Sequence, residues 1–475
     1  MVFAMPSESE NIEDKRELKA SLKPRHILMI SIGGTIGAGF FLGIAEPLKS
    51  IGALSTILAY GFAGLVLLGT MMCLSELSTA FPHSGSFQYF AYRLFKTPSL
   101  SFMIGWLYWL SWVFSIGASL IAAGLITNEF FPSIDVWVWC AFFLLVLILI
   151  NAMSAGAFGE CEYWLAALKV FAIIFFIFCG IILIGMRIRS TGTLPTLATE
   201  NGYFPQGWLS AIGCMTVVIY SFQGVELIGN VAGETKNPEK VIPGVIRGIG
   251  ARILIFYISA VAILAFISPN GHFTSAAGPF VDVFNQLGIP SAETFMKIVI
   301  LSASLSGANS GIYASSRMFW AMANTGMAPK YFGVVSKHHV PLRAICLCGF
   351  FSLVCVLSKH INAYRLFVFL ISSTAQVGCL AWMVIGACQL RYRNLVHRGV
   401  MKSNSKIWLS PLYPWTGIFV IAVNAFIIIS GWWGEDGIEM FLAEMILVAV
   451  IYLCYRFFYK SKNIRGELSN QVQSY

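Results

Sequence analysis

Charged residues are scarce in this sequence. Asp, Glu, Lys and Arg together make up 11% of its 475 residues, whereas hydrophobic residues make up 57%. A soluble domain carries about a quarter charged residues, and long soluble chains divide into domains with polar surfaces. So much apolar surface excludes a cytosolic enzyme, a secreted disulfide scaffold and a disordered chain. The composition predicts an all-α integral membrane protein with many spans.

The sequence also lacks the motifs of several other kinds of site. Its 7 histidines fall at the ends of apolar runs or in loops, without the spacing of metal ligands. It has no phosphate-cradling loop, which argues against an ATP-driven pump. Ten of its 11 cysteines lie within apolar runs, where cysteine packs as a small hydrophobic residue. We therefore expect no metal, no cofactor and no enzymatic activity.

Twelve apolar runs are long enough to cross a bilayer, whose hydrocarbon core of about 30 Å needs roughly 20 residues of helix. They cover about residues 26–46, 52–80, 100–130, 135–153, 160–186, 207–232, 247–268, 292–322, 342–358, 363–390, 412–431 and 438–459. The runs predict one transmembrane domain over 25–460, between tails at 1–24 and 461–475.

The distribution of basic residues predicts the orientation of the chain. With the N-terminus inside, 23 of the 31 Lys and Arg fall on the cytoplasmic side and 5 on the opposite side. Cytoplasmic loops of membrane proteins are enriched in Lys and Arg, so we expect both termini in the cytoplasm. The same rule explains the formal net charge of +9 without a nucleic-acid partner.

The first run is unusual because residues 33–39 contain four glycines. Each glycine costs a helix roughly 1 kcal/mol against alanine. Close helix packing through Gly33 and Gly37 is one explanation. The alternative is an unwound segment, which a membrane tolerates only around a cavity. Bare N–H groups at the start of a half-helix can hold a carboxylate, and we favour this second interpretation.

The sixth run contains a second polar interruption, YSFQGVE at residues 220–226. Carbonyl groups left free at such a break could accept hydrogen bonds from an ammonium group. The two interruptions are about 190 residues apart. Breaks at corresponding places in two five-helix halves are typical of a transporter site at a repeat interface.

Two ionisable residues lie deep in the runs, where a charge costs roughly 2.5–3.5 kcal/mol. Glu226 follows the second interruption, and Lys169 lies about eleven residues into the fifth run. Glu226 and Lys169 each either neutralise a buried opposite charge or take part directly in the function of the protein. Glu76 and Glu234 lie near helix ends, where structure or gating is the better interpretation. The small polar run over 306–317 either packs closely or lines a cavity.

Six stretches stand out as motifs. They are residues 34–43 (GTIGAGFFLG), 84–87 (SGSF), 158–170 (FGECEYWLAALKV), 221–229 (SFQGVELIG), 232–238 (AGETKNP) and 309–318 (NSGIYASSRM). Together they resemble the amino-acid permeases of the amino acid–polyamine–organocation superfamily, and bacterial lysine permeases most of all. The resemblance covers nearly the whole chain. It implies a five-plus-five inverted repeat of the leucine-transporter kind, two further C-terminal helices and alternating access.

The resemblance implies roles for both interruptions. The backbone of residues 35–39 would hold the substrate carboxylate, and carbonyls around 220–224 the α-amino group, with Tyr220 or Phe222 as an aromatic gate. The implied substrate-binding residues are Ser31, Thr35, Ile36, Gly37, Gly39, Tyr220, Phe222, Gly224 and Glu226. The implied gating or supporting residues are Glu234, Ser306 and Asn309.

The resemblance also bears on the coupling ion and on partners. Lys169 matches a lysine that stands near the sodium position of sodium-coupled members, which implies proton coupling, and Glu226 matches a glutamate implicated in handling protons or substrate charge. Lysine permeases usually carry threonine where this chain has Ala38 and Val225. The loop over 128–135 has no cysteine, so a disulfide-linked heavy subunit is not expected.

These observations predict a proton-coupled importer of an α-amino acid in a bacterial inner membrane, with a cationic substrate such as lysine favoured. An exchanger and a permease for neutral amino acids are the alternatives within transport. A membrane amino-acid sensor is an alternative of another class, although the short tails offer little surface for signalling. A channel would require a continuous polar pore face rather than two local breaks.

Overall fold

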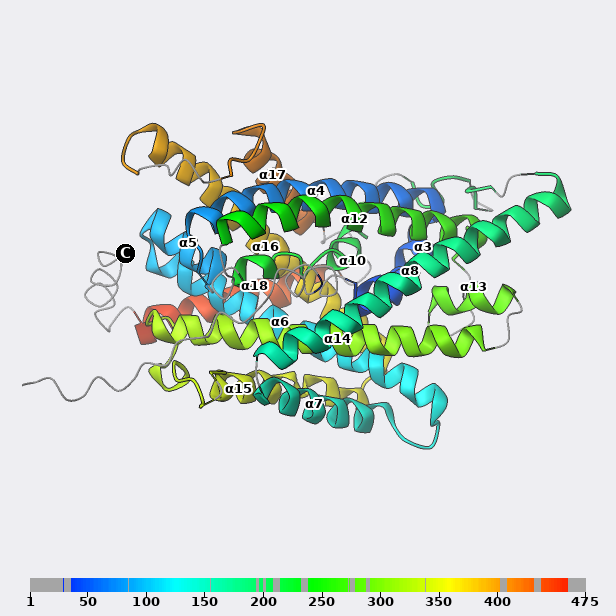
Figure 1. Cartoon of the computed structure of the whole chain (residues 1–475), viewed down its shortest axis with the longest axis horizontal. Coiled ribbons are helices and arrows are strands. Elements are labelled where there is room, and N and C mark those ends of the chain that lie inside the picture. The colour runs from blue at the N-terminus through cyan, green and yellow to red at the C-terminus, as the bar shows by residue number, and fades with distance from the viewer. Residues whose placement is uncertain are drawn as a thin grey trace, which may run out of the picture.

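The computed structural model describes Met29 and residues 36–83, 85–153, 155–193, 196–199, 202–207, 214–231, 238–271, 273, 278–287, 291–337, 339–401, 408–430 and 437–459. These residues are almost entirely helical, with one isolated β-bridge between Thr199 and Gly202. The long helices run roughly along one common axis (Figure 1). The prediction of an all-α protein is confirmed.

Each of the twelve predicted runs overlaps at least one described helix. The uninterrupted helices are α4 (Ala53–Ala80), α6 (Pro98–Phe130), α7 (Val136–Met153), α8 (Ala155–Thr191), α12 (Pro238–Ile267), α14 (Ala292–Asn324), α15 (Leu342–Ser352) with η3 (Leu353–Lys359), α16 (Ala363–His397), α17 (Trp415–Ser430) and α18 (Gly437–Cys454). Within the described parts of the chain, seven of these segments are long and apolar enough to cross a membrane. The count of twelve spans and the inverted repeat stay predictions.

Two of the predicted runs hold interrupted helices. The first contains α2 (Ala38–Phe41) and α3 (Ala45–Ile51), and the sixth contains α10 (Met215–Tyr220) and α11 (Leu227–Val231). α10 lies in the middle of the bundle, surrounded by long helices (Figure 1). The interruptions therefore occur inside the bundle and away from its ends.

Some helices differ from the predicted ranges. α5 (Ser86–Phe95) and α13 (Pro279–Leu287) are short helices that the scan for long apolar runs did not include, because each is too short to span a bilayer. α13 buries Phe280 and Phe284 and exposes Asn285 and Gln286, as expected of an amphipathic helix. The remaining short elements are η2 (Lys330–Phe332) and η5 (Tyr455–Tyr459).

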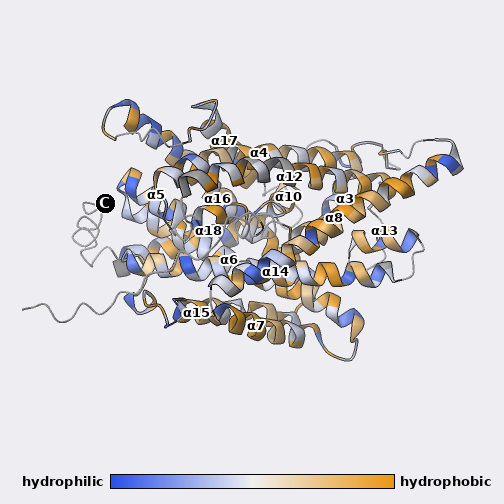
Figure 2. Cartoon of the chain, in the orientation of Figure 1, coloured by the Kyte–Doolittle hydropathy of each residue, from blue (hydrophilic) through white to orange (hydrophobic). Residues whose placement is uncertain are grey.

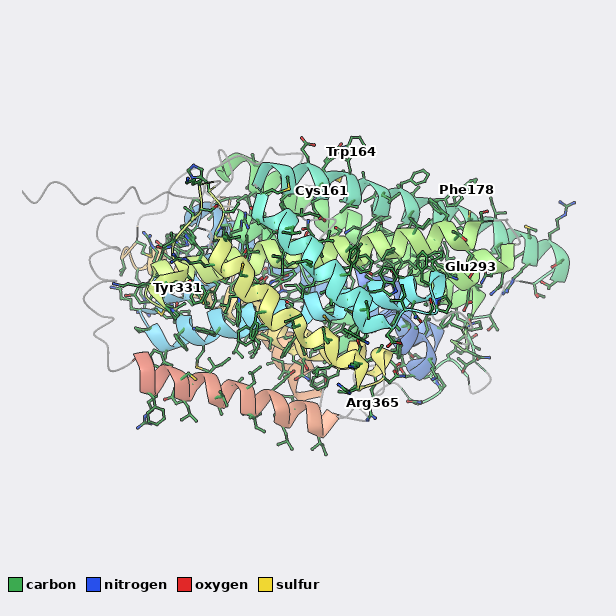
Figure 3. All side chains as sticks on the ribbon, turned by 90° about the horizontal axis from the view of Figure 1, so that it is seen from below. Cys161, Trp164, Phe178, Glu293, Tyr331 and Arg365 are labelled. Atoms are coloured by element: carbon green, nitrogen blue, oxygen red, sulfur yellow. The ribbon has the colours of Figure 1, made fainter. Side chains whose placement is uncertain are left out.

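The outer faces of the bundle are apolar, and hydrophobic residues dominate the long helices while hydrophilic ones gather at their ends (Figure 2). On α8, Trp164 and Phe178 point away from the bundle with exposed fractions of 69% and 61% (Figure 3). Large exposed apolar side chains along such a helix fit contact with lipid hydrocarbon. This distribution agrees with an integral membrane protein.

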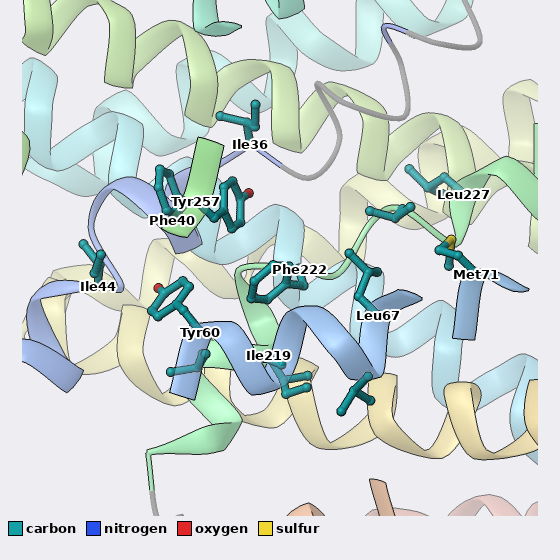
Figure 4. Packing of buried hydrophobic residues seen from close by; sticks show 14 of the residues in the cluster. Ile36, Phe40, Ile44, Tyr60, Leu67, Met71, Ile219, Phe222, Leu227 and Tyr257 are labelled. Atoms are coloured by element: carbon teal, nitrogen blue, oxygen red, sulfur yellow. The ribbon is translucent and has the colours of Figure 1, made fainter. Parts of the chain in front are cut away.

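An aromatic cluster fixes the two interrupted helices against α4 and α12. Phe40 of α2 stacks on Tyr257 of α12 with ring centroids 3.9 Å apart, and Phe222 lies 5.0 Å from Tyr257 (Figure 4). Tyr60 of α4 completes the cluster, 5.8 Å from Phe222. Buried ring pairs of this kind add to the free energy gained by burying their area, so the backbone beside each interruption is firmly anchored.

Candidate functional site

The second interruption is a stretch of turns between α10 and α11 over residues 221–226. Gly224 has a φ of +102°, which glycine adopts more readily than any other residue. Between described residues, no backbone N–H donates a hydrogen bond to the carbonyls of Ser221, Phe222 or Gln223. The predicted break in the sixth run is confirmed, and it leaves these main-chain acceptors without backbone partners.

The first interruption is described from Ile36 onward. Gly37 is extended, with φ −132° and ψ −164°, and α2 begins at the next residue. No described carbonyl accepts a hydrogen bond from the backbone N–H of Gly37, Ala38 or Gly39, as expected for the first residues of a helix. Ser31 and Thr35, which we predicted to contribute here, lie outside the described residues.

The two interruptions are in direct contact. The Ser221 hydroxyl donates a hydrogen bond to the Gly39 carbonyl at 3.2 Å, and the Tyr60 hydroxyl lies 3.0 Å from the same Ser221 oxygen. The Tyr220 ring lies against Gly39, so closely that a Cβ atom there would be 2.4 Å from the ring. Residue 39 therefore has to be glycine for this packing.

Residues of both interruptions line one small cavity. Its volume is about 30 Å³. That space has room for only about one or two water molecules, so a bound amino acid requires the walls to move apart. The lining residues are Gly37, Ala38, Gly39, Tyr108, Ser111, Trp112, Ser115, Ser119, Tyr220, Gln223, Glu226, Gly307, Thr374 and Gly378.

Glu226 supplies the carboxylate of this cavity. It is 2% exposed, and its oxygens accept hydrogen bonds from the Gly224 N–H at 3.1 and 3.2 Å. The Tyr108 hydroxyl donates to it at 3.0 Å, and Trp382 Nε1 at 3.4 Å. Glu226 therefore both borders the cavity and holds the second interruption in its turn conformation.

A row of hydroxyls on α6 forms another wall, which our sequence analysis missed. Ser111, Ser115 and Ser119 are spaced four residues apart, so they share one face of the helix. Ser115 Oγ lies 3.1 Å from the Tyr220 hydroxyl, which orients that ring. Serines four residues apart in an otherwise apolar run could have predicted a polar helix face at a cavity. α16 contributes Thr374 and Gly378 to the lining, and the Thr374 hydroxyl donates to the Ser111 carbonyl at 3.2 Å.

Several predicted site residues lie elsewhere. Ile36, Phe222 and Gly224 are not among the residues that line the cavity. Phe222 is fully buried in the aromatic cluster, so Tyr220 is the aromatic candidate that borders the cavity. Glu234 lies outside the described residues.

Lys169, Ser306 and Asn309 are buried outside the cavity lining, in two polar groups. Lys169 Nζ lies 3.8 Å from Glu162 Oε1, and the Ser306 hydroxyl donates to the same oxygen. Asn151 Nδ2 donates to Asn309 Oδ1 at 2.7 Å. Glu162 was not among our predicted site residues, although it stands in the motif over 158–170.

Glu76 is fully buried, and its carboxylate is held by an ion pair and hydrogen bonds. Arg393 forms an ion pair with it, Gln389 Nε2 donates to it at 3.1 Å, and the Ser410 N–H donates at 3.0 Å. The partner arginine stands on α16 beyond the predicted boundary at residue 390, because the helix continues to His397. This cluster ties α4 to α16 and to the segment before α17.

Comparison with known proteins identifies the family. The model of the family described as "Amino acid permease" matches residues 26–469. The chain belongs to this family. Its members are transporters, which confirms the prediction that the protein is not an enzyme, and the family together with the apolar helices confirms an integral membrane protein.

Three relatives illustrate how similar the chain is to known permeases. The chain is 36% identical to amino-acid permease RocC of Bacillus subtilis (strain 168), covering 97% of this chain and 98% of the relative. It is 33% identical to histidine permease HisP (95% and 98% covered) and 33% identical to lysine-specific permease LysP (96% and 93%), both of Lactococcus lactis subsp. cremoris (strain MG1363). Permeases named for different amino acids are thus similarly distant from it.

Proposed function

We propose that this permease imports an α-amino acid with a cationic side chain, lysine above all, by proton symport and alternating access. The observation that carries the proposal is the pair of interruptions. Within the described chain, the N–H groups of residues 37–39 and the carbonyls of residues 221–223 have no backbone hydrogen-bond partner, and the two segments border one cavity. A zwitterion has a carboxylate for the first set and an ammonium group for the second.

The charge of the cavity wall supports a cationic substrate. Glu226 is the acidic residue of the described lining, and no Lys, Arg or His is found among those lining residues. A carboxylate near a small cavity attracts a positive side chain strongly because water is excluded there. Lysine permeases usually carry threonine at positions 38 and 225, and the two replacements in this chain lie in different surroundings. Ala38 lines the cavity, whereas Val225 is buried in the apolar core.

Proton coupling is proposed from the buried ionisable groups. Glu226 at the cavity can bind and release a proton, and Lys169 supplies a fixed or titrating cation close to α14. Buried charges inside membrane spans mark ion and proton pathways. We place both termini in the cytoplasm and the protein in a bacterial inner membrane, with the substrate, protons and lipid as its partners and no disulfide-linked heavy subunit.

Counterflow in proteoliposomes tests the proposal. Uptake of radiolabelled lysine should be saturable, should be stimulated by an inward proton gradient, and should be independent of sodium. Unlabelled arginine or histidine should compete better than leucine if the side-chain preference is cationic. Sodium-dependent uptake, or gradient-driven uptake unchanged in Lys169→Met, would contradict proton coupling. Uptake only by exchange, or better competition by leucine, would favour the alternatives within transport.

A further inference from the structure

The buried pair of Glu162 and Lys169 has no part in the substrate cavity. The two residues are seven positions apart on α8, close to two helical turns, so they lie on the same face. Both side chains are 0% exposed. The opposite face of α8 carries Trp164 and Phe178, which project outward (Figure 3). The carboxylate therefore points into the bundle at the level of the ammonium group.

Glu162 is the charge partner that makes a buried lysine tolerable. An unpaired ion in the interior of a membrane protein is costly, and a partner of opposite charge offsets much of that cost. The 3.8 Å separation between Lys169 Nζ and Glu162 Oε1 gives a close electrostatic contact. Within the described chain, Glu162 Oε2 has no hydrogen-bond partner, so the carboxylate is held through one oxygen.

That oxygen also connects α8 to α14. The Ser306 hydroxyl donates to Glu162 Oε1. The next residue, Gly307, lines the substrate cavity, and Ser119 on the opposite wall lies 3.4 Å from the position a Cβ atom would take there. Glu162 is thus a single side chain in contact with both the buried ammonium group and the helix that forms one wall of the cavity.

We propose that Glu162 is the positioning residue of the coupling site: it fixes the Lys169 ammonium group and transmits its charge state to the cavity through Ser306. The inference rests on the proposed function, because it assumes that Lys169 takes part in coupling. Loss of the carboxylate uncouples the proton gradient from transport while the two interruptions, which hold the substrate, remain intact.

The test compares Glu162→Gln with Glu160→Gln. Glu160 is the matched control because it is the same residue type, two positions earlier on the same helix. Both variants are reconstituted and assayed for lysine counterflow without a gradient and for proton-driven lysine accumulation. In Glu162→Gln, counterflow should stay within about threefold of wild type because the site is separate from the cavity. Gradient-driven accumulation should fall by about tenfold or more, as expected when one partner of a buried charge pair is removed. Glu160→Gln should retain both activities.

Two further variants separate positioning from folding. Glu162→Asp should recover part of the accumulation, since it keeps the charge. The double variant Glu162→Gln/Lys169→Met should regain the thermal stability that Glu162→Gln loses, because it removes both members of the buried charge pair. Equal losses of counterflow and accumulation in Glu162→Gln, or no recovery of stability in the double variant, would overturn the inference. A wild-type protein without any lysine uptake would instead refute the proposed function, and the stability comparison would still decide whether the two charges are paired.

Discussion

The Ser221 hydroxyl donates a hydrogen bond to the Gly39 carbonyl oxygen across 3.2 Å, and so joins the two helix interruptions through residues that are 182 positions apart in the sequence. Tyr60 holds the same hydroxyl from α4. Because a polar group of one interruption bonds to the backbone of the other, the conformations of the two interruptions depend on each other.

Substitution of Ser221 by Ala should weaken substrate binding more than it weakens folding. One net hydrogen bond contributes about 0.5–1.5 kcal/mol, so the KM for uptake should rise by about two- to tenfold. Ser304→Ala is the matched control, because this buried hydroxyl bonds to Ile300 within its own helix. Equal KM values for the two variants in proteoliposome uptake would show that the Ser221 bond has no functional role.

Gly39→Ala should abolish transport while leaving a folded protein. The added methyl group would lie 2.4 Å from the Tyr220 ring, so the ring or α2 has to shift, which typically costs 1–3 kcal/mol. The shift moves the Tyr220 ring, the N–H groups at the start of α2, or both, and we propose that these groups gate and bind the substrate. Gly61→Ala on α4 is the control, because a Cβ atom there meets nothing within 4 Å. Normal uptake by Gly39→Ala would mean that Tyr220 does not pack this tightly during the transport cycle.

Arg393→Gln should destabilise the protein strongly, because it leaves the buried Glu76 carboxylate without its ion partner. Breaking a buried pair costs about 3–5 kcal/mol, and the double variant Glu76→Gln/Arg393→Gln should recover most of it. Thermal unfolding in detergent measures the effect. Arg365→Gln, at the exposed first turn of the same helix (Figure 3), should shift stability by no more than about 0.5 kcal/mol. Similar losses in both single variants would contradict this assignment.

Stability should also depend on His83, in the loop between α4 and α5. Burial, assisted by the nearby Arg93 guanidinium, lowers the pKa of His83 to about 4 from its ordinary 6.5. Its Nδ1 accepts the Gly85 N–H at 2.9 Å, which requires an unprotonated nitrogen. The unfolded chain binds this proton below pH 6.5, so the contribution of His83 is complete above pH 6.5 and is lost as the pH falls toward 4.

The pH dependence of thermal unfolding checks this assignment. One proton changes the free energy of unfolding by up to about 1.4 kcal/mol per pH unit. Wild type should therefore lose stability between pH 6.5 and 4, and His83→Asn should show a flatter profile over the same range. An identical slope in the two proteins would assign the acid sensitivity to other groups.

Local composition was enough to predict the break in the sixth run. Four glycines in residues 33–39, and Gln223, Gly224 and Glu226 deep in an apolar run, oppose regular helix whatever surrounds them. The direction of each side chain was not predictable. Tyr220 borders the cavity and Phe222 packs into the aromatic cluster, because helical periodicity does not continue through a stretch of turns.

The sequence by itself determined that the chain is a membrane protein, where its apolar runs lie, and which two of them are broken, because these properties depend on composition over short windows. Only the tertiary structure decided that Ser221 meets Gly39, that the serines of α6 share the wall with Glu226, and that Glu162 faces Lys169 and Ser306 together. These relationships depend on how helices distant in sequence pack, and that packing follows from the fit of the whole bundle.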